Sequence, residues 1–131
     1  MTADRTELLR LDVVGVVAAV PGGPISNANM GANAVKAARI TGVQTRHKAA
    51  GQTTDELCTA AAQRLLGNLG WDPASVDALI YVTQTPGIEM PSGAHLIHGA
   101  LGLRQNCVPL QVNYACAGYA PGSRSIFRGR S

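Results

Sequence analysis

Charged residues are scarce in this chain of 131 residues, because Asp, Glu, Lys and Arg together make up only 15% of it. An average soluble domain contains roughly 25% of these residues, and disordered chains combine high charge with low hydrophobicity. Hydrophobic residues make up 46% of the sequence, which argues against disorder. A chain of this length can bury roughly two-thirds of its unfolded surface, so the composition predicts one packed domain with a buried sheet.

Long apolar runs are also lacking. The longest uncharged apolar run, 13–25, is broken by glycine and proline. It is shorter than the roughly 20 residues that a membrane-spanning helix needs. The residues before Leu11 include Asp4 and Glu7 and have no apolar core, which does not fit a secretory signal. We therefore expect a cytoplasmic protein with no transmembrane segment.

Cysteine and histidine are too few, and too irregularly spaced, for a zinc ribbon or a disulfide framework. The cysteines Cys58, Cys107 and Cys116 form neither an even set nor a CxxC pair, so we expect reduced thiols. His95 and His98 are three residues apart, a spacing that a metal site can use, but no third ligand accompanies them. We predict no metal site and no cofactor.

The net charge of +3 comes from the end of the chain. Residues 1–120 hold eight Lys or Arg and eight Asp or Glu, and the excess consists of Arg124, Arg128 and Arg130. A basic tail can contact phosphates without specificity, but a solvated, disordered terminus is the more common case. We expect a domain over 1–120, a disordered tail over 121–131, and neither a membrane nor a specific nucleic acid as partner.

Three apolar stretches, 11–20, 76–83 and 107–112, predict strands buried on both faces, although Pro109 weakens the third. The first stretch closes with two prolines and two glycines, which indicate a turn. The segment 26–40 is compatible with a loop and a short helix.

Two helices are predicted between these strands. Thr53 precedes Glu56 by three residues, which is the capping-box spacing, and leucines and alanines at intervals of four predict a helix over 54–69. Ser92 can cap a second helix that ends at Gly102. The order strand, helix, strand, helix, strand predicts a layered α/β domain with parallel neighbouring strands.

Cys116 stands where the third predicted strand turns into a helix, between small residues. A helix N-terminus lowers the pKa of a thiol, and backbone N–H groups at such a turn can hold a developing oxyanion. Ala115, Ala117 and Gly118 leave room for a substrate. A small buried cysteine that packs as a hydrophobic residue is the commoner alternative, so position alone leaves both interpretations open.

Six short motifs together carry a resemblance that covers about residues 11–119. They are Thr41-Gly42-Val43 with Arg46-His47, Thr53-Thr54-Asp55, Leu69-Gly70-Trp71-Asp72-Pro73 through Val82-Thr83-Gln84-Thr85, Met90-Pro91-Ser92, Leu101-Gly102, and Ala115-Cys116-Ala117-Gly118-Tyr119. In order and spacing they resemble the N-terminal half of β-ketoacyl-[acyl-carrier-protein] synthase III, a thiolase-fold family. The fold that this resemblance implies is a thiolase-like layered α/β half-domain. Its mixed or parallel sheet is covered by helices and ends after the nucleophile turn.

The resemblance implies an acyltransferase of type II fatty-acid biosynthesis that works as a homodimer. In the family a cysteine takes an acyl group from acyl-CoA, and this acyl group is then condensed with malonyl carrier protein. Cys116 matches the acylated cysteine. Met90 stands where a residue of the family, often Phe, reaches across the dimer into the partner's acyl pocket. A flexible thioether there suits a longer or differently shaped chain.

The chain also departs from the family pattern. The family's bacterial members often hold the CoA adenine with a Trp and an Arg, where this chain has Lys36 and Ile40, so a carrier-protein thioester is an alternative donor. The family continues as a hydrophobic helix after Tyr119, whereas this chain reads Ala120-Pro121-Gly122. The catalytic His and Asn of the family belong to its other half. We therefore expect no condensation by this chain alone.

Two other interpretations stay open. In the first, the chain is a non-catalytic interaction module that pairs with an intact synthase through the dimer surface of the family. In the second, the parent enzyme is a hydroxymethylglutaryl-CoA synthase or a polyketide starter synthase, which also use a cysteine at this place.

Overall fold

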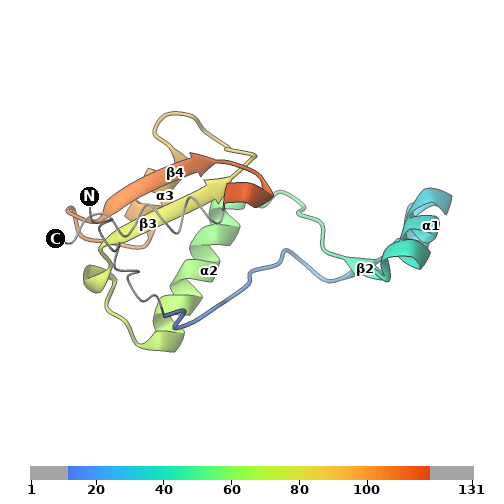
Figure 1. Cartoon of the computed structure of the whole chain (residues 1–131), viewed down its shortest axis with the longest axis horizontal. Coiled ribbons are helices and arrows are strands. Elements are labelled where there is room, and N and C mark those ends of the chain that lie inside the picture. Colours follow the sequence, from blue (N-terminus) through green and yellow to red (C-terminus); the bar gives the residue numbers. More distant parts are fainter. Residues whose placement is uncertain (1–11, 119–131) are drawn as a thin grey trace, which may run out of the picture.

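The computed structural model describes residues 12–118, apart from the side chain of Cys116. Figure 1 shows a body, residues 54–118, from which an arm, residues 25–48, extends to one side. The arm contains β1 (Ile25–Ser26), the 3₁₀ helix η1 (Asn27–Met30), α1 (Ala32–Thr41) and β2 (Thr45–Arg46). The body contains α2 (Thr54–Leu69), η2 (Pro73–Ser75), β3 (Ala78–Thr83), α3 (Gly93–Ala100), β4 (Val108–Asn113) and η3 (Cys116–Gly118).

Helix α2 has the bounds that the sequence predicts. The Glu56 amide donates to the Thr53 hydroxyl over 3.2 Å, and the Thr53 amide donates to the Glu56 carboxylate over 2.8 Å. This reciprocal capping box satisfies two amides that the first helical turn leaves without a partner. At the other end Gly70 has φ +64°, the left-handed conformation that ends many helices and suits glycine. The capping prediction is confirmed at both ends.

The two strands of the body confirm the positions of the second and third predicted strands within two residues. The expected burial on both faces is wrong for β4, where Val108 is 59% exposed and Leu110 is 38% exposed. β3 and β4 pair in parallel, from Ala78 opposite Val108 to Thr83 opposite Asn113. Parallel neighbours need a crossover connection, and α3 lies in it. The core cluster gathers residues of β3, α3 and the segment before β4, with side chains of α2 packed against it. Its buried members are Tyr81, Ala94, Ile97, Leu101, Leu103 and Cys107.

Helix α3 begins after Ser92, as predicted, and its last residue is Ala100. The predicted side-chain cap is wrong, because the Ser92 hydroxyl lies 2.9 Å from Nδ1 of His95 and makes no capping bond to the backbone. Gly102 follows with φ +63°, which suits the turn out of the helix.

The predicted strand over 11–20 is wrong for the described residues 12–20, which form no regular element. A strand needs a neighbouring backbone to bond to, and the body sheet has two strands, β3 and β4. The segment instead runs extended against α2, where a Cβ placed on Gly15 would lie 2.8 Å from Leu65. Val13 is 75% exposed and Val16 is 85% exposed. Val17 is partly buried, so one side of the valine run packs against the body while Val13 and Val16 face solvent.

The arm is organised around one buried amide. Asn27 is only 1% exposed, and its Nδ2 donates to the Val43 carbonyl over 2.6 Å. Its Oδ1 accepts from Nε of Arg46 over 2.5 Å, which joins η1 to β2. Strands β1 and β2 pair antiparallel, and α1 ends at Gly42 with φ +76°. The expectation of a loop and a short helix over 26–40 is confirmed by η1 and α1.

Two further expectations concern the ends of the chain and the membrane. The predicted boundary at 120 and the tail over 121–131 lie outside the described residues. Within residues 12–118, no helix is long and apolar enough to cross a membrane.

Candidate active site at the end of strand β4

The main candidate residue, Cys116, lies three residues beyond the last residue of β4 and begins η3. The Gly118 amide donates to the Ala115 carbonyl over 2.9 Å, so the backbone turns sharply at the cysteine. Figure 1 shows this turn beside the ends of β3 and β4. In parallel α/β sheets, ligand sites gather at the carboxyl ends of the strands. The predicted strand-to-helix position is thus observed for the backbone, as a three-residue 3₁₀ turn.

Gly118 allows this turn to pack closely on the sheet. A Cβ placed on Gly118 would collide with the Val82 side chain and would lie 2.8 Å from Cβ of Tyr114. Only glycine leaves room for this approach without movement of the neighbours. Gly118 therefore fixes the backbone around Cys116 against the end of β3.

The two other cysteines occupy different surroundings. Cys58 is half-buried on α2, and burial followed by the nearby Asp55 charge raises the pKa of its thiol. Cys107 is buried before β4, and burial raises the pKa of its thiol although Arg104 acts in the opposite direction. Because the thiolate is the nucleophile, both groups are poorly suited to covalent chemistry at neutral pH.

A hydrogen bond that the sequence did not reveal joins α2 to β3. The Tyr81 hydroxyl donates to Oδ1 of Asp55 over 2.7 Å. Burial, and then this bond to the carboxylate, raises the pKa of Tyr81 to about 12. Gly93, the first residue of α3, packs directly on the pair: a Cβ there would lie 2.8 Å from both Asp55 and Tyr81. The pair therefore sets where α3 begins.

Met90, the predicted substrate-pocket residue, lies in the turn before α3 and is 90% exposed. The bond from Met90 to Pro91 is cis. The preceding residues Gly87 and Ile88 border a cavity of about 480 Å³ against α2 and α3. The structure thus keeps Met90 outside the core of its own chain, in a turn whose position depends on the start of α3.

His95 and His98 lie on α3, whereas His47 follows β2, and each of the three contacts a different oxygen. Nδ1 of His47 is 3.1 Å from the carbonyls of Pro21 and Gly22. His95 faces the Ser92 hydroxyl, and Nε2 of His98 is 3.0 Å from the Arg104 carbonyl. In the described part of the chain, no three His, Cys, Asp or Glu side chains gather as metal ligands would.

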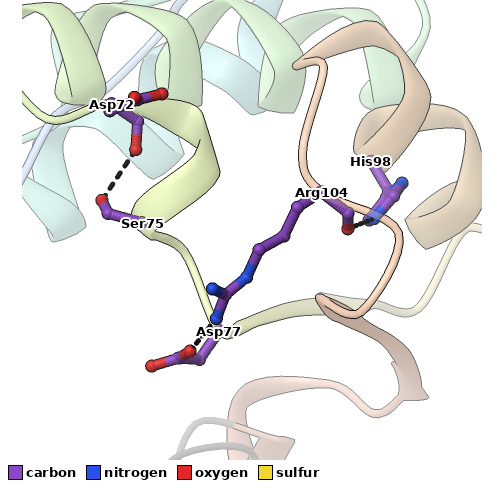
Figure 2. Close-up of polar contacts among 5 residues, drawn as sticks. All are labelled: Asp72, Ser75, Asp77, His98 and Arg104. Atoms are coloured by element: carbon purple, nitrogen blue, oxygen red, sulfur yellow. Dashed lines mark hydrogen bonds and ion pairs between the residues drawn. The ribbon is translucent and has the colours of Figure 1, made fainter.

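Figure 2 shows how the other end of β4 is held. Arg104, in the loop before β4, forms an ion pair with Asp77, which precedes β3, while the Arg104 carbonyl faces His98. The Val108 amide donates to the Asp77 carbonyl over 3.0 Å. These contacts fix the register of β4 against β3, and so determine where the turn at Cys116 falls.

The chain is similar in sequence to curated proteins named beta-ketoacyl-[acyl-carrier-protein] synthase III. The chain is 32% identical over 88 residues to the beta-ketoacyl-[acyl-carrier-protein] synthase III of Levilactobacillus brevis, covering 67% of this chain and 27% of that protein. It is 36% identical over 80 residues to the synthase III of Neisseria meningitidis serogroup C, covering 60% of this chain and 25% of that protein. The chain thus spans about a quarter of the length of the curated relatives it matches. No family model matches it.

Solved structures show the same likeness over more of the chain. A 3-oxoacyl-(acyl-carrier protein) synthase from Burkholderia xenovorans matches with a TM-score of 0.76 and 36% identity, covering 88% of this chain and 36% of that one. A tetronic acid condensing enzyme matches with a TM-score of 0.75 and 28% identity, covering 92% of this chain and 39% of that one. Sequence and fold therefore point to the same group of condensing enzymes.

Proposed function

Because this chain is a β-ketoacyl-[acyl-carrier-protein] synthase III-like segment with a thiolase-like α/β fold, we propose that it acts as an acyltransferase unit of fatty-acid biosynthesis. Its substrates are thioesters of CoA or of acyl carrier protein, and Cys116 takes the acyl group. The observation that carries the proposal is the position of Cys116, at a turn beside the carboxyl ends of both parallel strands.

The proposed step exchanges one thioester for another. The Cys116 thiolate attacks the carbonyl carbon of the donor, and backbone N–H groups of the turn hold the negative charge that forms on the oxygen. The tetrahedral intermediate collapses, the bond to the donor sulfur breaks, and the donor thiolate leaves and takes up a proton. The product is acyl-Cys116, and no oxidant or cofactor is consumed.

Met90 has a supporting role in this proposal. Its side chain is exposed in the turn before α3, which suits a residue that enters the acyl pocket of a second chain in a homodimer. An unbranched thioether adapts to irregular apolar shapes, so Met90 would influence which acyl chains fit. The Asp55–Tyr81 pair would act through the start of α3 as a positioning element.

In this proposal the chain alone accepts an acyl group but does not carry out the condensation. Condensation needs donors aimed at an enolate oxygen, and losing even one oxyanion-type donor typically costs about a hundredfold to a thousandfold in rate. His47, His95 and His98 each contact an oxygen of another residue. We assign acyl transfer to a domain over 1–120 in the cytoplasm, and condensation to a partner or longer protein.

Acyl transfer can be tested on the purified chain. Radiolabelled acyl-CoA and acyl carrier protein are offered to wild type, Cys116→Ala and Cys58→Ala, and the labelled peptide is identified by mass spectrometry. Wild type and Cys58→Ala should be labelled on Cys116, and Cys116→Ala should not. Equal labelling of Cys116→Ala, or no labelling of any variant by either donor, would contradict the proposal.

A second candidate function is an interaction module that pairs with an intact synthase. The observation that favours it is the exposed valine run, since Val13 and Val16 present apolar side chains to solvent. An intact synthase added to this chain should then form a mixed complex whose formation is blocked by Val16→Lys. If size-exclusion chromatography shows both proteins eluting separately, the module interpretation fails.

A further inference from the structure

A pocket lies at the edge of the sheet opposite Cys116. It has a volume of about 190 Å³ and is bordered by α2, by the loop after α2 and by the segment before β4. Val76 and Leu103, which precede β3 and β4, belong to its lining, whereas Cys116 follows β4. Because β3 and β4 are parallel, residues before both strands lie at the opposite edge from residues after them. The pocket is therefore separate from the proposed acyl site.

The pocket reaches from the surface into the apolar core. Its lining consists of Val, Ala and Leu side chains and one Trp, with no charged residue among those that the structure describes. Leu101 and Leu103 are 9% and 7% exposed and belong to the core cluster, so they form the floor. Val14 is 58% exposed and Trp71 is 48% exposed, so they form the rim. A ligand can therefore enter from solvent and contact the core.

The surroundings of the pocket disfavour an anionic ligand. Asp72 and Asp77 directly adjoin the lining residues Trp71 and Val76 in the sequence. The nearby Arg104 forms an ion pair with Asp77, so its positive charge is already compensated (Figure 2). An apolar lining beside two carboxylates fits an uncharged ligand better than a carboxylate or a phosphate.

The size of the pocket selects a small hydrocarbon group. An apolar protein cavity of about 150 Å³ stays dry and binds benzene. A pocket of about 190 Å³ therefore accepts a hydrocarbon of similar or slightly greater size. A stable protein partner needs a far larger surface, roughly 800 Å² on each side. The end of an alkyl chain can enter this pocket while its polar head stays in water beyond Trp71.

We propose that this pocket binds the end of an unbranched, uncharged alkyl chain at a site separate from Cys116. The lining offers no nucleophile, acid or base, so the chain is bound there and not converted. Since Leu101 and Leu103 belong to the core cluster, a bound chain extends the apolar core and stabilises the body. This inference goes beyond the proposed function and does not depend on acyl transfer.

Trp71 is the only tryptophan of the chain, so its fluorescence reports on the rim of the pocket. Unbranched butanol, hexanol, octanol and decanol are titrated into the full wild-type chain. We expect a saturable shift of the Trp71 emission to shorter wavelength. Each added methylene that enters the pocket should tighten binding about fourfold, and the affinity should level off once the pocket is full. Octanoate, which has the same chain length as octanol and a carboxylate, should bind more weakly.

Variants that fill or charge the pocket test its location. Ala62→Leu adds a side chain inside it, and Ala60→Leu, exposed on the same helix and outside this pocket, is the matched control. We expect about tenfold weaker octanol binding for Ala62→Leu and a change of less than about twofold for Ala60→Leu. Ala62 also borders a neighbouring cavity that Val14 does not border. Val14→Asp, in a segment without regular structure, should therefore weaken binding as well without risk to the helix.

Several outcomes would overturn the proposal. These are no saturable change with any alcohol, an affinity that does not depend on chain length, tighter binding of octanoate than of octanol, equal weakening by Ala60→Leu, or no effect of Val14→Asp. Labelling of Cys116 by acyl-CoA is measured separately. Octanol binding without labelling contradicts only the proposed function, and labelling without octanol binding contradicts only the alkyl-chain pocket.

Discussion

The body and the arm of this chain are each stabilised by a different kind of interaction. The body buries a continuous apolar cluster from β3, α3 and the segment before β4, whereas Ala38 is the buried apolar residue of the described arm. The arm depends on Asn27, a buried amide that bonds to Val43 and Arg46. The comparison teaches that apolar burial stabilises the body, which carries Cys116, whereas one buried polar side chain stabilises the arm.

The largest effect should come from the core of the body. Ile97 is 2% exposed, so Ile97→Ala removes buried methyl groups and leaves a cavity. We expect a loss of about 2–5 kcal/mol in the free energy of unfolding, measured by urea denaturation. Ile40→Ala, on the exposed face of the arm, is the matched control and should change this free energy by less than about 0.5 kcal/mol. Similar losses of stability for both variants would contradict the claim that apolar burial stabilises the body and not the exposed face of the arm.

A smaller but more local effect should come from Gly93. Gly93→Ala places a Cβ against Asp55 and Tyr81 at the start of α3, which should cost about 1–3 kcal/mol of stability. Gly99→Ala is the control within the same helix, because a Cβ there meets nothing within 4 Å. It should stabilise by about 0.5–1 kcal/mol, since alanine favours a helix over glycine. If both substitutions stabilise the protein, Gly93 does not pack as closely on Asp55 and Tyr81 as described.

Asn27→Ala should affect the arm and spare the body. It leaves the Val43 carbonyl and the Arg46 guanidinium without their partner, a local cost of about 1–3 kcal/mol. Hydrogen exchange should be faster at the backbone amides of residue 27 and of Gly42, which bond to the carbonyls of Gln44 and Ala38, and unchanged in β3. Faster exchange in β3 as well would mean that the arm supports the body.

A further effect, confined to high pH, should come from Tyr81. The folded-state pKa of Tyr81 is raised to about 12, above its unfolded value of roughly 10. The proton is therefore bound more tightly in the folded state, and this stabilisation is present below pH 10 and lost as the pH rises through 12. The stability difference between wild type and Tyr81→Phe should shrink over that range. A difference that does not change between pH 9 and 12 would contradict the hydrogen bond to Asp55.

The sequence predicted those parts of the fold that local signals determine. The capping box at Thr53 and the left-handed glycine at 70 define α2, and turn residues bound β3, α3 and β4. The failure of the first strand has a physical cause, since a valine-rich run becomes a strand only beside another backbone. The sequence placed Cys116 at the end of a strand, and its role as nucleophile stays a prediction.

Other features could not be predicted because they depend on distant residues. Tyr81 and Asp55 are 26 positions apart, and no periodicity links a strand tyrosine to a carboxylate in the first turn of a helix. The buried Asn27 lies in a stretch of small polar residues whose pattern did not distinguish it from its neighbours. Residues 13–54 contain four Lys or Arg and no Asp or Glu, and residues 55–118 contain five Asp or Glu and two Arg, but only the fold shows that these two stretches occupy separate regions.

The central claim, that Cys116 is the reactive thiol, is tested most directly by competition among the three cysteines. The folded chain is treated with limiting iodoacetamide at neutral pH, and alkylation of each cysteine is followed by mass spectrometry. Because burial raises the thiol pKa of Cys58 and Cys107, we predict that Cys116 is modified first. Faster modification of either Cys58 or Cys107 in the folded chain would contradict the account.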